Sequence, residues 1–115
     1  MIPPNLHDLT IHQAHSLLSA RQISAVELTE SVLDRVMNVD EKVNSFVTIT
    51  KELAMNQASQ ADQALNLGEA NPLTGIPVQI KDNICTIGVR TTCASKMLND
   101  FIPPYNSTVA CLLYT

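Results

Sequence analysis

The sequence predicts an α/β protein, or a piece of one, in which helices and strands form a mixed layer. Apolar residues recur every three or four positions in three segments, and they alternate one by one in two others. These two spacings are the periods of helices and of strands. The resulting order of helix, helix, strand, helix, strand is typical of a mixed α/β layer. As a closed domain this set of elements looks incomplete.

Two helices are expected near the N-terminus. Thr10 and Gln13 form a capping-box pattern ahead of a short helix that ends before Arg21. Ser24 and Glu27 repeat the box and begin a longer helix. Its core-facing positions at helical spacing are Leu28, Val32, Val36 and Val39.

A first strand is expected over residues 43–50, where β-branched residues alternate with others. Helical spacing then returns with a face of small residues until Gly68, which is a typical helix end. A second strand is expected over residues 76–81, because Ile76 begins an alternation that stops at two turn-forming residues. In this strand the even-numbered side chains point inward, and Lys81 shares a face with Gln79.

The remaining residues read as turns followed by a last helix. Gly88 makes a turn, residues 91–95 are all small, and two prolines at 103–104 break the chain. Asn106 or Ser107 could cap one further helix. We therefore divide the chain into a helical lead-in of about residues 1–70 and a strand, loop and helix over about residues 71–115.

Composition favours one domain or less with an aliphatic core, since the 115 residues are 45% hydrophobic but only 3% aromatic. The net charge is -4 and the basic residues are scattered, whereas nucleic-acid binding needs concentrated positive charge. We therefore expect no direct nucleic-acid patch in this chain. No run approaches the ~18 apolar residues that span a membrane, so no membrane partner is expected.

The cysteines and the N-terminus indicate a cytoplasmic location. Cys85, Cys93 and Cys111 are odd in number and form no CxxC pair, which argues against a disulfide framework and against a zinc site. Cys85 and Cys93 read as small core residues. The first ten residues, MIPPNLHDLT, contain neither a basic segment nor an apolar one of the kind that a secretory signal needs.

Three histidines near the N-terminus are weak metal candidates. His12 and His15 are three residues apart and could face one side of the first helix, and His7 precedes them. Because no third ligand lies nearby in the sequence, we interpret them as solvated helix residues and expect no metal.

Lys81 allows two interpretations from its pattern. It is either a charged residue that closes a strand or a general base. Lysine is almost never fully buried unless it is paired, which favours the first interpretation. A lysine acts as a base near pH 7 only if desolvation and its neighbours lower its pKa by roughly 3 units from ~10.4. Periodicity does not decide between the two.

Residues 73–83, LTGIPVQIKDN, resemble the lysine motif of the amidase signature family, in which a glycine, a proline and Lys-Asp-Asn stand at this spacing. The resemblance continues on both sides, through the helix of residues 24–29, through 91–96 (TTCASK) and through 103–105 (PPY). Within the family it is to the start of the A subunits of aspartyl/glutamyl-tRNA amidotransferases, and it reaches about Val109. It implies the family's mixed sheet covered by helices, of which this chain would hold the first helices and strands.

The resemblance also implies a mechanism with a Ser-cis-Ser-Lys triad. Lys81 would take a proton from a bridging serine, which activates a nucleophilic serine that attacks a carboxamide. In the amidotransferases that carboxamide is glutamine or asparagine, and the ammonia is passed on to amidate a mischarged tRNA. The resemblance further implies partner subunits B and C. ATP and magnesium are used by the partner, so this chain is expected to bind no cofactor.

Neither family serine has a counterpart here, because nothing after Asn83 resembles the Gly/Ser-rich segment that carries them. Ser95 and Ser107 have plainer roles in a turn and as a helix cap. Asp82 and Asn83 are interpreted as turn and bracing residues around the lysine. The last residues, 110–115, depart from the family, as in a truncated or frame-shifted product. We expect the chain alone to have no amidase activity.

Two alternatives remain open from the sequence. The lysine motif fits equally an amidase of the same family that acts on free amides without tRNA. The chain could also persist as a noncatalytic interaction fragment, since helices without their sheet partners leave apolar surface exposed.

Overall fold

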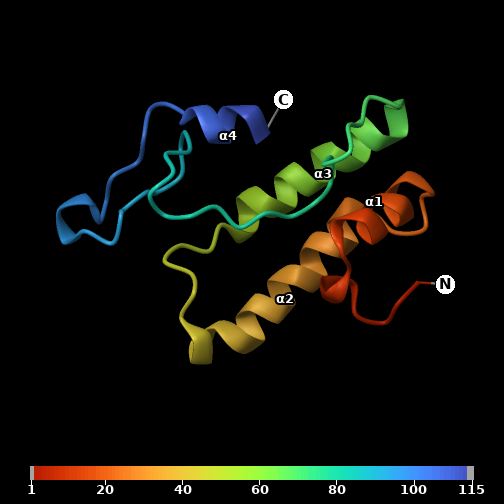
Figure 1. Cartoon of the computed structure of the whole chain (residues 1–115), viewed down its shortest axis with the longest axis horizontal. Helices are drawn as coiled ribbons and strands as arrows, with labels where there is room; N and C mark the ends of the chain where they lie inside the picture. The colour runs from red at the N-terminus through yellow and green to blue at the C-terminus, as the bar shows by residue number, and fades with distance from the viewer. Residues whose placement is uncertain (1, 114–115) are drawn as a thin grey trace. The chain divides into compact units, whose positions relative to one another are not determined.

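The computed structural model describes residues 2–113. Their elements, shown in Figure 1, are the 3-10 turns η1 (Leu6–Asp8) and η2 (Lys96–Leu98) and the helices α1 (Ile11–Ser19), α2 (Ala25–Val43), α3 (Lys51–Leu67) and α4 (Thr108–Leu113). These residues divide into two compact units. Residues 2–45 and 50–78 form one, here called the helical unit, and residues 46–49 and 79–113 form the other, here called the loop unit.

Both predicted capping boxes are confirmed. The Thr10 hydroxyl accepts a hydrogen bond from the Gln13 amide at 3.2 Å, and the Gln13 side chain accepts one from the Thr10 amide at 3.0 Å. At the start of α2, Ser24 and Glu27 make the same reciprocal pair at 3.0 and 2.9 Å. Each box satisfies two amides that a helix start would otherwise leave without a partner.

Asp62 of α3 completes the N-terminus of α2. Its carboxylate accepts hydrogen bonds from the amides of Ala25 at 2.6 Å and Val26 at 3.2 Å. These are the first two amides of α2, and a negative group is also favoured there by the helix dipole. The bond joins α2 to α3, which run as antiparallel neighbours in Figure 1.

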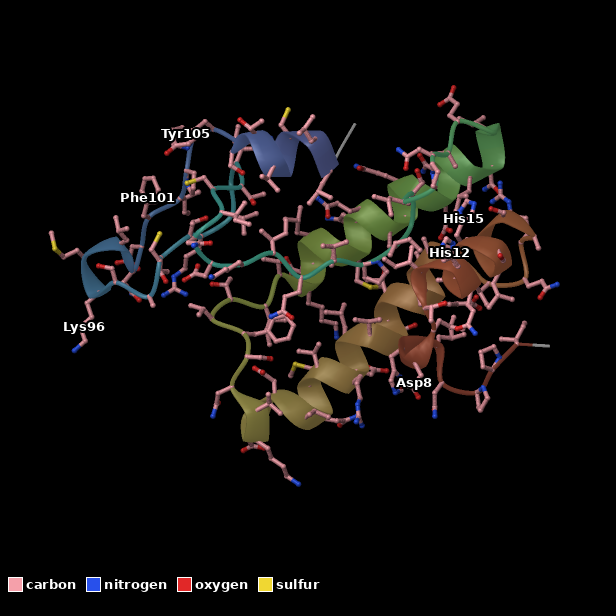
Figure 2. All side chains as sticks on the ribbon, in the orientation of Figure 1. Asp8, His12, His15, Lys96, Phe101 and Tyr105 are labelled. Atoms are coloured by element: carbon pink, nitrogen blue, oxygen red, sulfur yellow. The ribbon has the colours of Figure 1, made fainter. Side chains whose placement is uncertain are left out.

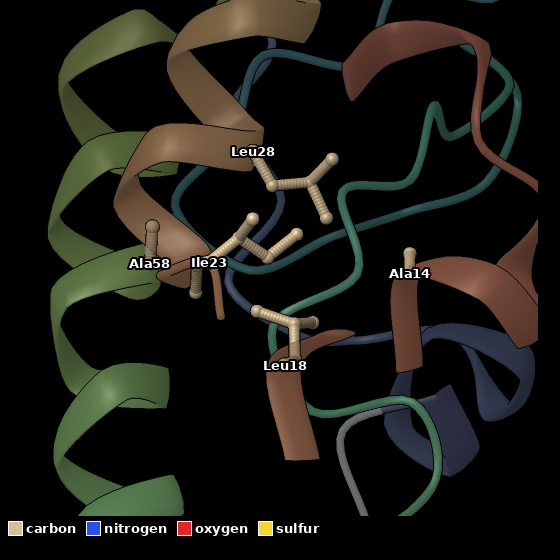
Figure 3. Packing of buried hydrophobic residues seen from close by; sticks show 6 residues of the cluster. Ala14, Leu18, Ile23, Leu28 and Ala58 are labelled. Carbon is tan, nitrogen blue, oxygen red and sulfur yellow. The ribbon is translucent and has the colours of Figure 1, made fainter. Parts of the chain in front are cut away.

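The core of the helical unit is small and aliphatic, as the composition predicts. Figure 3 shows its buried side chains converging from α1, from Ile23 and the start of α2 that follows it, and from α3. The cluster consists of Ala14, Leu18, Ile23, Ala25, Leu28 and Ala58. Alanines at the contacts let the helix backbones approach closely, which agrees with the predicted small-residue face of the third helix.

The predicted strand over residues 43–50 is wrong. Helix α2 continues to Val43 and ends at Asn44, which takes the left-handed conformation with φ 53°. Asp40 then holds the turn, because its carboxylate accepts hydrogen bonds from the amide and the hydroxyl of Ser45 at 2.7 and 3.0 Å. Residues 44–50 contain no strand. Local capping overrides the β-branched pattern here.

The predicted strand over residues 76–81 is also wrong, and with it the α/β layer is not formed within residues 2–113. The described chain has no strand, and its β-type pairing is an isolated antiparallel bridge between Thr86 and Val89. Alternation fixes which side chains share a face, but a strand also needs a neighbour to pair with. Val78, predicted to point inward, is 59% exposed.

Among the helices of residues 2–113, none combines the length and the apolarity that a membrane crossing requires.

Candidate catalytic lysine and its surroundings

The first half of the lysine motif is anchored on the helical unit by a compact turn. The Asn71 side chain accepts a hydrogen bond from the Leu73 amide at 2.9 Å, and the Thr74 hydroxyl accepts one from the Asn71 amide at 2.9 Å. Gly75 follows with φ 84°. A Cβ at Gly75 would lie 3.1 Å from Cβ of Ala25 and 3.3 Å from Cδ1 of Leu18. Glycine is therefore required both by the conformation and by the close approach.

The same segment helps to line a small cavity of the helical unit. Its volume is about 150 Å³, and its walls come mainly from apolar side chains of η1, α1 and α2, with Ile76 and Pro77 from the motif. Lys81 does not line it. The cavity is therefore no candidate for an active site around the lysine.

Lys81 lies in the loop unit and is exposed. Its carbonyl accepts a hydrogen bond from the Ile84 amide at 3.0 Å, which closes a tight turn directly after the lysine. Lys81 is thus exposed, as a residue that closes a strand would be, but residues 76–81 form no strand. A role as a base would need further chain to cover the side chain.

Asp82 fastens the position after the lysine to residues 91–94. Its carboxylate accepts hydrogen bonds from the amide of Thr92 at 2.9 Å, from the hydroxyl of Thr92, and from the amide of Ala94 at 3.4 Å. Its carbonyl accepts a fourth from the Cys93 amide at 3.0 Å. These bonds confirm the interpretation of Asp82 as a bracing residue, and we call the contacts between Asp82 and residues 92–94 the Asp82 clasp.

The clasp favours the ionised form of its carboxyl group. The hydrogen bond from the Thr92 hydroxyl is the largest influence that lowers the pKa of Asp82 below its ordinary value of 3.8, followed by the bond from the Thr92 amide. The positive charge of Arg90 acts in the same direction. Thr92 itself is 3% exposed, so this donor is held by its surroundings.

Arg90 ties three segments of the loop unit together. Its guanidinium donates to the Thr48 hydroxyl at 3.0 Å and to the Asn99 side chain at 2.6 Å, and its Nε donates to the Asn99 carbonyl. Arg90 thus joins residues 46–49 and the end of η2 to the loop that carries the clasp. Sequence reasoning did not find this role, because a single arginine between turn residues has no distinguishing pattern.

Two chain segments of the loop unit run past each other without forming a regular ladder. The backbone pairs are Ser107 to Cys85 at 2.8 Å, Gly88 to Pro103 at 3.1 Å and Thr91 to Phe101 at 3.0 Å, each written from the amide donor to the carbonyl acceptor. Their order is antiparallel. Irregular spacing, with two prolines at 103–104, keeps them from becoming strands.

The candidate nucleophiles of this chain have structural roles. The Ser107 hydroxyl accepts a hydrogen bond from the Ala110 amide at 3.2 Å, which confirms it as the cap of α4. The Ser95 amide donates to the Thr92 carbonyl at 2.8 Å and closes a turn. Neither arrangement activates a hydroxyl for attack.

The cysteines only partly match their interpretation as core residues. Cys85 is half-buried, and its thiol lies 3.7 Å from the Tyr105 hydroxyl. This contact is the main influence that raises the pKa of Tyr105, which is labelled in Figure 2. Cys93 and Cys111 are exposed, so the interpretation is wrong for Cys93. Cys93 sits in a left-handed turn with φ 52°, where its amide donates to the Asp82 carbonyl.

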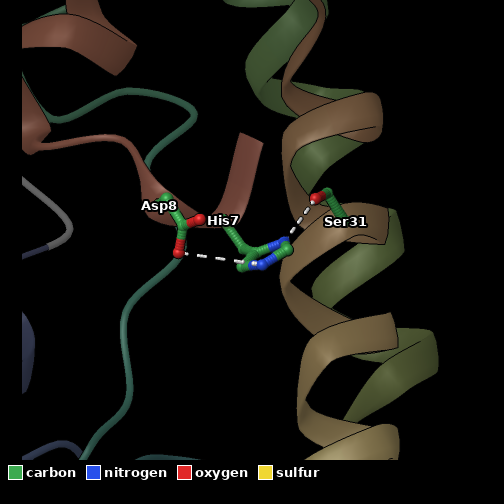
Figure 4. A network of polar contacts seen from close by, with 3 residues as sticks. All are labelled: His7, Asp8 and Ser31. Carbon is green, nitrogen blue, oxygen red and sulfur yellow. Dashed lines mark hydrogen bonds and ion pairs between the residues drawn. The ribbon is translucent and has the colours of Figure 1, made fainter. Parts of the chain in front are cut away.

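The histidines have ordinary surroundings. His7 lies between Ser31 of α2, whose hydroxyl is 3.3 Å from Nδ1, and Asp8, whose carboxylate is 3.7 Å from Nε2 (Figure 4). His12 and His15 both project from α1 (Figure 2). Within the described chain no three histidine, cysteine or acidic side chains are grouped so that they could hold a metal ion.

Comparison with known proteins places the chain in a family. The model of the family described as Amidase matches residues 27–114, and the chain therefore belongs to the amidase family. The match includes the lysine motif, the clasp and the capped start of α4. The resemblance found in the sequence is thereby confirmed at the level of the family.

The similar relatives include A subunits of glutamyl-tRNA(Gln) amidotransferases. The chain is 54% identical over 90% of its length to the A subunit of the glutamyl-tRNA(Gln) amidotransferase of Caldanaerobacter subterraneus subsp. tengcongensis. It is 50% identical over 96% of its length to the protein of the same name from Desulforamulus reducens. The matched parts make up 21% and 23% of these relatives, so the chain spans about a fifth of the length of the curated proteins that it resembles.

Proposed function

We propose that this chain supplies the lysine of an amidase that releases ammonia from glutamine for the amidation of mischarged tRNA. Lys81 is the base of its Ser-cis-Ser-Lys triad. The observation that carries the proposal is the lysine motif at residues 73–83, which lies inside the family match in a chain about half identical to amidotransferase A subunits. The glutamyl-tRNA(Gln) and aspartyl-tRNA(Asn) reactions are both within this proposal.

The chain alone performs only part of this work. In this proposal both serines of the triad come from a segment that has no counterpart in this chain. The same holds for the residues that must cover Lys81 before it can lose its proton. In this proposal the B and C subunits are the partners, glutamine is the small-molecule substrate, and ATP with magnesium acts at the partner that holds the tRNA. The isolated chain is a noncatalytic fragment.

The test is a protein in which this chain replaces the matching segment of the Caldanaerobacter relative, produced together with the B and C subunits of that organism. We call it the restored protein. It should release ammonia from glutamine, whereas the purified 115-residue chain should release none above background. An inactive restored protein that is folded and assembled would contradict the proposal.

The second candidate, an amidase that acts on free amides without tRNA, predicts a different result in the same assay. The identity to amidotransferase A subunits favours the tRNA enzyme. If mischarged tRNA and ATP leave the rate of glutamine hydrolysis unchanged and simple amides are hydrolysed as fast, the second candidate is the better one.

A further inference from the structure

The Asp82 clasp holds the residue next to Lys81 by both its side chain and its main chain. The carboxylate accepts from Thr92 and Ala94, and the carbonyl accepts from Cys93. The donors therefore come from three consecutive residues. Such contacts fix the direction in which the chain leaves Lys81, because the side chain and the carbonyl of Asp82 are both hydrogen-bonded to the same loop.

The loop of residues 92–94, which supplies the donors, has an unusual backbone conformation. Cys93 and Ala94 both take left-handed conformations, with φ 52° and 57°, which residues with a Cβ rarely adopt. The loop is held at its start by Thr91 and Thr92, each 3% exposed. Two consecutive unfavourable residues persist only when their surroundings determine them. Here they turn successive amides toward Asp82.

The rate of a reaction catalysed by a lysine base depends on where the backbone places that lysine. Its amine is carried on a flexible four-carbon side chain, so the backbone sets the point from which the amine reaches its partner. A displacement of about 1 Å at a reacting group lowers a rate by roughly 100-fold. The turn closed by the Ile84 amide on one side and the clasp on the next residue together limit such displacement at Lys81.

We propose that Asp82 and Thr92 are positioning residues, which hold the backbone of Lys81 so that its amine meets the bridging serine of the triad. Neither touches the substrate. The inference rests on the proposed function of Lys81 and adds the two residues that position the backbone of this lysine.

The test uses the restored protein with a set of matched variants. Thr92→Val keeps the shape of the side chain and removes the hydroxyl, Thr92→Ser keeps the hydroxyl, and Asp100→Asn changes an exposed carboxylate of the same unit. We expect Thr92→Val to lower kcat for glutamine by about 10- to 100-fold with KM within twofold. Thr92→Ser should retain most of kcat, and Asp100→Asn should behave as the unchanged protein.

The split between kcat and KM separates positioning from a general loss of structure, which would reduce the amount of folded protein without changing kcat per folded molecule. If Thr92→Val does not fold, Asp82→Asn is measured in its place with the same expectation. Full kcat in a folded Thr92→Val or Asp82→Asn protein would overturn the inference and leave the role of Lys81 standing. Full activity of a Lys81→Ala protein would instead overturn the proposed function, and the inference with it.

Discussion

At the scale of single residues, the turn at Asp82 could be predicted from the sequence, but the donors that bind its carboxylate could not. An Asx pair after an apolar run marks a turn, and the Ile84 amide does close one on the Lys81 carbonyl. The donors to Asp82, however, are residues 92–94, ten or more positions away. No local pattern selects Thr92 over the other small residues of 91–95, because its role follows from burial and from the left-handed turn beside it.

The clasp predicts a pH dependence at this residue. A carboxyl group whose pKa is lowered by folding stabilises the folded state above its unfolded pKa, here 3.8, and this stabilisation is lost as the pH falls through the lower folded pKa. Thr92→Val removes the largest cause of the shift, so the pKa of Asp82 should rise toward 3.8. A carbon-13 NMR titration of the carboxyl group measures this, with Thr92→Ser as the control that keeps the low pKa. Equal pKa values in all three proteins would contradict the clasp.

At the scale of elements, the helices of the helical unit could be predicted, whereas two segments were wrongly predicted to be strands. The boxes at Thr10 and Ser24 and the stop at Gly68 are local, so the sequence contains all their partners within a few residues. The alternation at 76–81 is also local, but a strand is a pairing between segments. Asp62 is a further nonlocal case, since nothing in α3 marks it as the acceptor for the start of α2.

The contribution of Asp62 to the helical unit can be measured directly. Asp62→Ala leaves the amides of Ala25 and Val26 without their acceptor and should reduce the free energy of unfolding by about 1 kcal/mol, as the loss of a helix cap does. Urea unfolding followed by circular dichroism, at a dilution that keeps the chain monomeric, measures it. Asp34→Ala, at an exposed position of α2, is the matched control and should stay within about 0.5 kcal/mol of the unchanged protein. Equal losses of unfolding free energy at the two sites would show that the hydrogen bonds to Asp62 do not stabilise the helical unit.

The turn that anchors the lysine motif gives a second element-scale prediction. Gly68 and Gly75 both have positive φ, at 72° and 84°, but a Cβ at Gly68 meets nothing within 4 Å. Gly68→Ala should therefore lose roughly 1 kcal/mol of stability for its conformation alone. Gly75→Ala should lose that amount and roughly 1–3 kcal/mol more, because the added methyl group presses on Ala25 and Leu18. The same unfolding experiment measures both, and similar losses would mean that the turn does not pack as described.

At the scale of the whole molecule, large apolar side chains stay exposed in both units. Leu67 is 72% exposed in the helical unit, and Met97 and Leu112 are 95% and 68% exposed in the loop unit. Large apolar side chains left in contact with water favour association with a surface that covers them. The chain covers about a fifth of the length of the relatives that it matches.

We therefore expect the isolated chain to associate. Sedimentation velocity over a range of concentrations should show species larger than the 12.6 kDa monomer as the concentration rises, and a dye that binds apolar surface should fluoresce with the isolated chain more than with the restored protein. A monodisperse monomer with a cooperative thermal transition would contradict this expectation.

The central claim is that Lys81 is the base of an amidase, and ammonia release from glutamine by the restored protein tests it most directly. Lys96 offers a matched control in the same unit, since it is exposed and its side chain extends away from η2 (Figure 2). Lys81→Ala should lower kcat by about 100- to 10,000-fold, as loss of a general base does, and Lys96→Ala should leave it within twofold. If the Lys81→Ala protein is folded, assembles with its partners and releases ammonia as fast as the Lys96→Ala protein, Lys81 is not the catalytic base.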